Sequence, residues 1–216
     1  MTTQLAAFTA GASATYMLGL GMGVSPPLFG KEEVREWNRR KWGKRACAVM
    51  DELDADWRYM LMRPKSSNRN FVHVQSDAKR ISFVCYTSFW DRRLRGVAKF
   101  GMSSAQQPNN KCICGGAVSA AADQILGMFA VTMLMLPVVT ANLDVQLKQN
   151  IPLGSELGML CTIEEGSDRI KKLIVRLSFY FLEEDVDESK REAAVVTGIF
   201  VNSILPMLPD SLRSYL

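Results

Sequence analysis

Histidine is almost absent from this sequence, and its cysteines follow no framework. His73 is the single histidine among 216 residues, which excludes a metal site built from several histidines and leaves one candidate base for any Ser-His-Asp scheme. The cysteines are odd in number and lack the spacings of disulfide-rich domains or zinc sites. We therefore predict a reducing compartment with free, mostly buried thiols. The five cysteines are Cys47, Cys85, Cys112, Cys114 and Cys161.

Charged side chains are missing from the first thirty residues. Residues 5–24 are long enough to cross a bilayer, at about 20 residues per span, although Ala, Gly, Ser and Thr make them only weakly hydrophobic. Small residues recur at every fourth position, a stripe that lets another helix approach closely. We predict a membrane or subunit-interface helix within residues 1–30, with contacts through residues 5–29. The alternatives are a cleaved targeting peptide or a disordered tail, and the absence of arginine argues against a mitochondrial transit peptide.

Basic residues gather directly after this segment. Seven Lys or Arg side chains lie between Lys31 and Arg45, diluted by three glutamates. The positive-inside tendency would keep the bulk of the protein on the cytosolic or matrix side of a membrane. We expect association with the mitochondrial inner membrane from the matrix side, or otherwise with the cytosolic face of a membrane. A short basic cluster interrupted by acids does not indicate a nucleic-acid partner.

The apolar pattern changes along the chain and suggests domain boundaries. Residues 32–62 have apolar side chains at helical spacing, so an amphipathic helical region is predicted there. A polar linker with a proline follows at residues 63–70. We divide the chain into an apolar segment at 1–30, a basic helix and linker at 31–70, a main domain at 71–205 and a tail at 206–216.

Within the main domain the apolar residues alternate with period two, except in one long stretch. Strands are predicted over residues 71–75, 81–88, 95–101, 139–147, 157–163, 172–181 and 193–201. One apolar helix is predicted over residues 114–136, opened by two glycines and closed at Pro137. Because a helix apolar on all sides must be wrapped, we expect an α+β protein in which a curved antiparallel sheet surrounds that helix. This is the hotdog arrangement.

Asp123 is the single charged residue between Lys111 and Asp144. A carboxylate buried in the central helix costs on the order of several kcal/mol unless it is paired, and its desolvation suits a general base or nucleophile near neutral pH. The alternative is an acid that emerges at a domain edge. Asp123 follows Gly116 by seven residues, about two helical turns. The N–H groups of Gly115 and Gly116 at the helix start could therefore hold a polarised carbonyl oxygen on the same helix face.

Together these residues resemble a known family. The run Cys-Gly-Gly-Ala-Val-Ser-Ala-Ala-Ala-Asp from Cys114 to Asp123, with Gly127 beyond it, resembles the His-Gly-Gly…Asp…Gly signature of PaaI-like and Them-type acyl-CoA thioesterases. Thr-Ala-Asn-Leu at residues 140–143 and Ile-Pro-Leu-Gly at residues 151–154 are similar to the next strand and hairpin of that family. The resemblance covers about residues 81–201.

The resemblance implies a dimer, either of two copies or with another hotdog chain, that places acyl-CoA sites at its interface. Asp123 would activate water or attack the thioester, and Thr140 would orient the water or the acid. An N–H of Gly115 or Gly116 would stabilise the oxyanion, and Cys114 and Asn142 would contact the substrate. Coenzyme A would lie along the outer face and the acyl chain between the subunits. No cofactor and no metal are implied.

One position departs from the family pattern, because Cys114 stands where the family has histidine. A thiol is a poor hydrogen-bond donor, so the prediction of an active thioesterase becomes weaker. The alternatives are a catalytically degenerate hotdog subunit of a mitochondrial membrane complex, or a module that binds acyl thioesters without turnover. Cys114 could itself be nucleophilic at the helix start, although no histidine base is visibly provided.

Overall fold

The computed structural model describes residues 42–62, 81–105, 111–164, 172–182 and 191–203. Two long helices, one 3-10 turn and seven strands make up this part of the chain. The helices are α3 (Lys44–Ala55) and α5 (Gly115–Leu134), and the 3-10 turn η1 spans Met102–Ser104. The strands are β1 (Met60–Met62), β2 (Ile81–Ser88), β3 (Arg93–Phe100), β4 (Val138–Leu147), β5 (Glu156–Ile163), β6 (Lys172–Phe181) and β7 (Glu192–Asn202).

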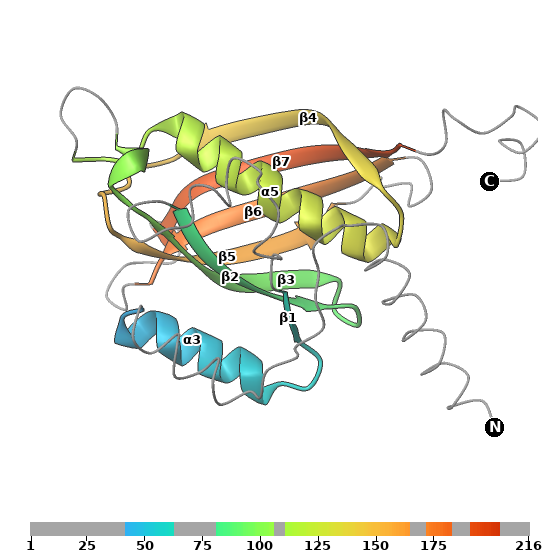
Figure 1. Ribbon diagram of the computed structural model, residues 1–216, viewed down its shortest axis with the longest axis horizontal. Coiled ribbons are helices and arrows are strands. Elements are labelled where there is room, and N and C mark those ends of the chain that lie inside the picture. The colour runs from blue at the N-terminus through green and yellow to red at the C-terminus, as the bar shows by residue number, and fades with distance from the viewer. Residues whose placement is uncertain (1–41, 63–80, 106–110, 165–171, 183–190, 204–216) are drawn as a thin grey trace, which may run out of the picture.

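The strands form one curved sheet in the order β1-β2-β3-β5-β6-β7-β4, with every neighbouring pair antiparallel. Strand β4 leaves α5 and pairs with β7, so the strand that directly follows the helix lies at one edge of the sheet. Figure 1 shows α5 along one side of the sheet and α3 on the other. A curved antiparallel sheet around a central helix is the hotdog fold, and the predicted fold class is confirmed.

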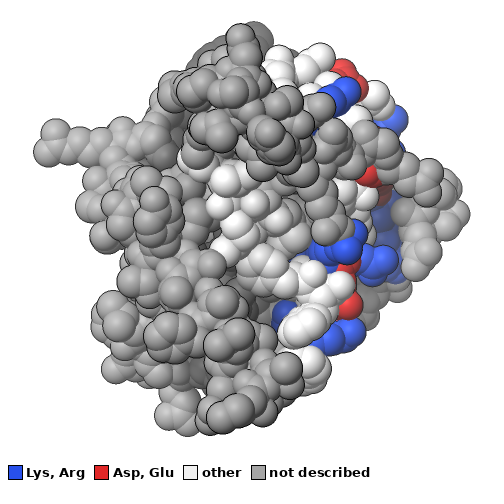
Figure 2. All heavy atoms as spheres, turned by 90° about the vertical axis from the view of Figure 1, so that its right-hand side faces the viewer, with Lys and Arg blue, Asp and Glu red and all other residues white. Residues whose placement is uncertain are grey.

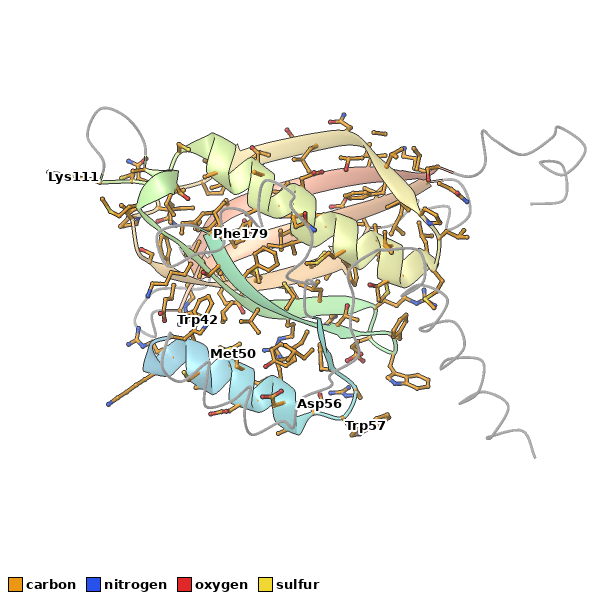
Figure 3. All side chains as sticks on the ribbon, viewed as in Figure 1. Trp42, Met50, Asp56, Trp57, Lys111 and Phe179 are labelled. Carbon is orange, nitrogen blue, oxygen red and sulfur yellow. The ribbon has the colours of Figure 1, made fainter. Side chains whose placement is uncertain are left out.

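Helix α5 and the inner face of the sheet share the main core. The chain enters α5 from Cys114 in extended conformation and leaves it at Met135, whose left-handed φ of 56° ends the helix just before Pro137. One side of α5 is buried against strands that include β6, where Phe179 lies in the same core (Figure 3). The buried residues of α5 are Val118, Ala121, Ala122, Ile125, Leu126, Phe129 and Ala130.

The sheet covers only that one side of α5. Several apolar residues on the rest of the helix, among them Met128 and Met133, are only partly buried in the single chain. The sheet therefore curves around one side of this helix, and the other side stays partly exposed in a single copy. Among the described residues, α5 is also the one helix long and apolar enough to span a membrane, and its buried side packs as a core helix does.

Helix α3 covers the outer face of the sheet. Trp42, Met50 and Leu53 are buried against side chains of β2 and β3 in a second, smaller core (Figure 3). Two polar contacts hold the helix in place. Both carboxylate oxygens of Glu156 accept the N–H of Gly43 at 2.9 and 3.0 Å, and Arg95 pairs with Glu52 at 2.8 Å.

The helix predicted over residues 32–62 ends earlier, at Ala55. Asp56 explains the stop, because its carboxylate accepts hydrogen bonds from the backbone N–H and the guanidinium of Arg58 and so favours a turn over another helical turn. The chain then forms β1, a strand that the pattern did not predict, which pairs with β2.

The other predicted elements agree with the structure to within two residues at each end where they are described. The segments 1–30, 63–70 and 71–75 lie outside the described residues, as does the tail. All five cysteines are free. Only Cys85 and Cys161 are buried, however, so the expectation of mostly buried thiols is wrong.

Candidate functional site

The start of α5 presents two glycines with free backbone donors. The N–H of Cys114 donates to the carbonyl of Ser104 at 2.8 Å, which anchors the chain just before the helix. Within the described part of the chain, the N–H groups of Gly115 and Gly116 have no acceptor, as expected for a first helical turn. Gly116 is exposed, and a Cβ placed on it would meet nothing within 4 Å. The helix start is therefore open to a bound carbonyl group.

The end of β4 lies against this helix start. A Cβ placed on Gly115 would stand 3.3 Å from Cδ1 of Leu147, so any larger residue there would require the Leu147 side chain to shift slightly. Leu147 is itself 48% exposed and provides an apolar surface beside the two backbone donors. Nothing in the sequence indicated that Leu147 would lie beside Gly115.

Asp123 lies two turns further along α5 and is paired with Thr140. The Thr140 hydroxyl donates to Oδ1 of Asp123 at 2.8 Å, which leaves Oδ2 without a partner in the described residues. Asp123 is exposed, so the prediction of a buried acid is wrong for the single chain. The reason is that Asp123 faces the edge strand β4, beyond which no further strand of the described residues covers α5.

A bulge in β4 brings Thr140 to this side. Thr140 is opposite Phe200 of β7, while Asn142 is opposite Ile199, so Ala141 is an extra residue in the ladder. Phe200 belongs to the inner core, which places Thr140 on the inner face, and strict alternation would then have placed Asn142 there too. The bulge re-aims one of the two side chains. Asn142 therefore points to the outer face and is not brought together with Asp123.

The two parts of the predicted site are too far apart to act together within one chain. Seven residues of α-helix at 1.5 Å each separate Asp123 from Gly116 by about 10 Å along the helix axis. A thioester carbonyl held by the glycine N–H groups would thus lie beyond the reach of the carboxylate on the same chain. One copy holds two separate half-sites: an acid with its threonine, and an oxyanion-binding helix start.

Both half-sites lie beside the open edge of the sheet. Among the described residues, β4 pairs only with β7, so its other side offers unpaired backbone groups. Val139 and Leu147, near the two ends of this strand, are about half exposed. Cys114 is partly exposed, and its thiol makes no capping hydrogen bond to α5. No group of three or more potential metal ligands is present in the described residues.

The strand order and the wrapped helix define a hotdog-fold protein, and its structural neighbours are thioesterase-superfamily proteins. An acyl-CoA hydrolase from Staphylococcus aureus is 18% identical, with 57% of this chain and 70% of that chain covered and a TM-score of 0.43. The Escherichia coli PaaI protein is 9% identical, with coverage of 73% and 93% and a TM-score of 0.46. A Streptococcus mutans protein bound to acetyl CoA is 16% identical, with coverage of 62% and 97% and a TM-score of 0.46. No family model and no curated protein matches the sequence.

Proposed function

We propose that this protein binds acyl-CoA thioesters and hydrolyses them at a site completed by a second hotdog protomer. The observation that carries the proposal is the exposed Asp123–Thr140 pair on the same uncovered side of α5 as the open Gly115–Gly116 helix start. An open helix start alone, or an exposed acid alone, is common in proteins and would not indicate a function. Their combination on one helix face, beside an unpaired strand edge, supports the resemblance seen in the sequence.

The edge strand β4 suggests how the second protomer completes the site. Two copies can pair their β4 edges antiparallel about a twofold axis, which is the commonest symmetry of dimers. If the axis passes near the middle of the strand, Leu147 of one chain lies opposite Thr140 of the other. Since Leu147 lies beside Gly115, and Thr140 binds Asp123, this pairing brings the oxyanion-binding half-site of one chain to the acid half-site of its partner.

The chemistry follows from the groups in place. Asp123 Oδ2 takes a proton from a water molecule, and the water oxygen attacks the thioester carbonyl carbon. The oxyanion that forms accepts hydrogen bonds from the Gly115 and Gly116 N–H groups of the other chain. The carbon–sulfur bond then breaks, the coenzyme A thiolate leaves and takes up the proton, and a carboxylic acid remains. Thr140 holds Oδ1 throughout, so that Oδ2 faces the water.

Release of coenzyme A from acyl-CoA of several chain lengths tests the proposal. We expect Asp123→Asn to lower kcat by about 10²- to 10⁴-fold, the usual contribution of a general base. Because Asp123 is exposed, the melting temperature should stay unchanged. Absence of turnover by the wild-type dimer at every chain length would refute hydrolysis.

The second candidate is a catalytically degenerate hotdog subunit with a structural role in a mitochondrial membrane complex. The cysteine in place of the family's histidine favours it, because the Cys114 thiol does not cap α5. Cys114→His separates the two candidates. A gain of turnover in this variant over an inactive wild type would support degeneration, whereas an active wild type would support the enzyme.

The location of the protein is a separate proposal based on residues 1–30, which lie outside the described residues. We expect a chain that lacks residues 1–30 to leave the mitochondrial membrane fraction on carbonate extraction while the full chain stays in it. Release of the full chain would count against an inserted helix.

A further inference from the structure

An exposed aromatic patch lies at the far end of the sheet from β4, where two turns meet. Trp57, in the turn between α3 and β1, is 77% exposed, and Trp90, in the hairpin between β2 and β3, is 72% exposed. Their ring centroids are 6.3 Å apart. Phe89 of the same hairpin is 40% exposed. Two tryptophans held together in water, from turns distant in sequence, are unusual for a monomer surface.

A network of ion pairs fixes the two turns relative to each other. Arg58 binds Asp56 within its own turn at 2.7 Å and reaches Asp91 of the hairpin at 3.4 Å. In the hairpin, the N–H of Asp91 donates to the Ser88 hydroxyl at 3.2 Å. The two turns that carry the aromatic side chains are therefore ordered before binding, which lowers the entropic cost of binding.

The charges in this patch are arranged unequally. Both acids, Asp56 and Asp91, are paired with Arg58. Arg92 and Arg93, which follow directly in the hairpin, have no ion pair in the described part of the chain. Figure 2, which looks onto the side where the hairpin turns, shows basic side chains interspersed with acidic ones around uncharged residues. Three arginines (Arg58, Arg92 and Arg93) thus stand against two acids, so the two turns together carry a net charge of +1.

We propose that Trp57, Phe89 and Trp90, flanked by Arg92 and Arg93, dock this end of the domain onto an anionic lipid surface. Tryptophan suits the bilayer interface because its ring is apolar and its N–H is polar. Unpaired arginines complement anionic headgroups. The patch consists of two protruding turns rather than a groove, so a flat, deformable surface fits it better than a protein cavity would. The proposal goes beyond the proposed function and rests on none of residues 1–41.

Tryptophan fluorescence of the full chain with phosphatidylcholine vesicles, with and without phosphatidylserine, tests this docking. We expect a blue shift of the emission and quenching by brominated lipids, both stronger when phosphatidylserine is present. The double variant Trp57→Ser, Trp90→Ser should lose most of the quenching, because these two exposed rings are the ones expected to enter the bilayer interface. Quenching, and not the bound fraction, is the decisive measurement, because an N-terminal membrane helix would hold all variants on the vesicles alike.

Two further variants separate docking from folding. Met102→Ser removes a side chain that is 63% exposed just beyond the other end of β3, and should leave the quenching unchanged. Arg92→Gly removes a cation at a residue whose φ is 51°, so it should raise the melting temperature while it lowers the quenching on vesicles that contain phosphatidylserine.

Three outcomes would overturn the proposal. The first is a wild-type emission that no vesicle changes. The second is a Trp57→Ser, Trp90→Ser variant that is quenched like the wild type. The third is self-association of the wild type without lipid, lost in that variant and seen by sedimentation velocity, since the patch would then serve contacts between copies.

Discussion

The two faces of the sheet are covered in different ways. On the outer face, α3 packs through buried apolar side chains and is held by the contacts of Glu156 and Arg95. On the inner face, α5 is buried on one side only and keeps Gly116 and Asp123 exposed on the other. The outer helix completes the fold within one chain, whereas the inner helix leaves a surface for something else to complete. Substitutions on the two faces should therefore differ in kind.

The largest effect is expected from Leu53→Ala on α3. Leu53 is 1% exposed in the outer core, and truncation of such a side chain costs about 2–5 kcal/mol. Denaturant unfolding measures this loss, and hydrolysis per folded molecule should change little. A large fall in kcat with unchanged stability would show that the outer face also serves the site.

Gly116→Ala should lower the rate of hydrolysis and leave the stability of the fold unchanged. Beyond its own helical turn, a Cβ at this position would meet nothing within 4 Å, so the fold should tolerate it. Alanine keeps the backbone N–H, but its Cβ would push a thioester carbonyl away from that donor, so we expect kcat to fall about 10²-fold, as when one oxyanion donor is lost. Thermal unfolding of the same preparation provides the control. An unchanged kcat would place the oxyanion site elsewhere.

Thr140→Val tests the acid half-site with a smaller change. Valine keeps the shape of the side chain but cannot donate to Asp123 Oδ1. We expect kcat to drop about tenfold through misorientation of the carboxylate, the loss of one hydrogen bond to a charged group. Thr140→Ser, which retains the hydroxyl, should recover most of the activity. Equal activity of the valine and serine variants would argue against this role.

Glu156→Ala is the mildest of these changes and should cause only a small loss of stability. It removes the acceptor for the Gly43 N–H and the partner of Lys99, which lies 3.1 Å away. These groups are near the surface, so we expect a cost of about 1 kcal/mol in the free energy of unfolding. Lys99→Met is the matched control, since it removes the ion pair but keeps the contact with Gly43. Equal costs for both would mean that α3 gains nothing from Glu156 at its start.

Much of the fold followed from local pattern. Alternation with period two predicted β4 over residues 139–147, and an apolar stretch between two glycines and Pro137 predicted α5. The pattern failed where a single contact outweighs periodicity. The side chain of Asp56 turned a predicted helix into a turn followed by β1, and the bulge at Ala141 separated Thr140 from Asn142.

The sequence by itself determined a central apolar helix with one acid, a glycine pair at its start and the strands around it, because these depend on neighbouring residues along the chain. Only the tertiary structure decided that Asp123 is exposed, that Thr140 binds it and that Leu147 lies against Gly115. It also decided that Trp57 meets Trp90. Each of these contacts joins segments whose proximity depends on strand register and on which side of a helix the sheet covers. That information is non-local, so periodicity does not contain it.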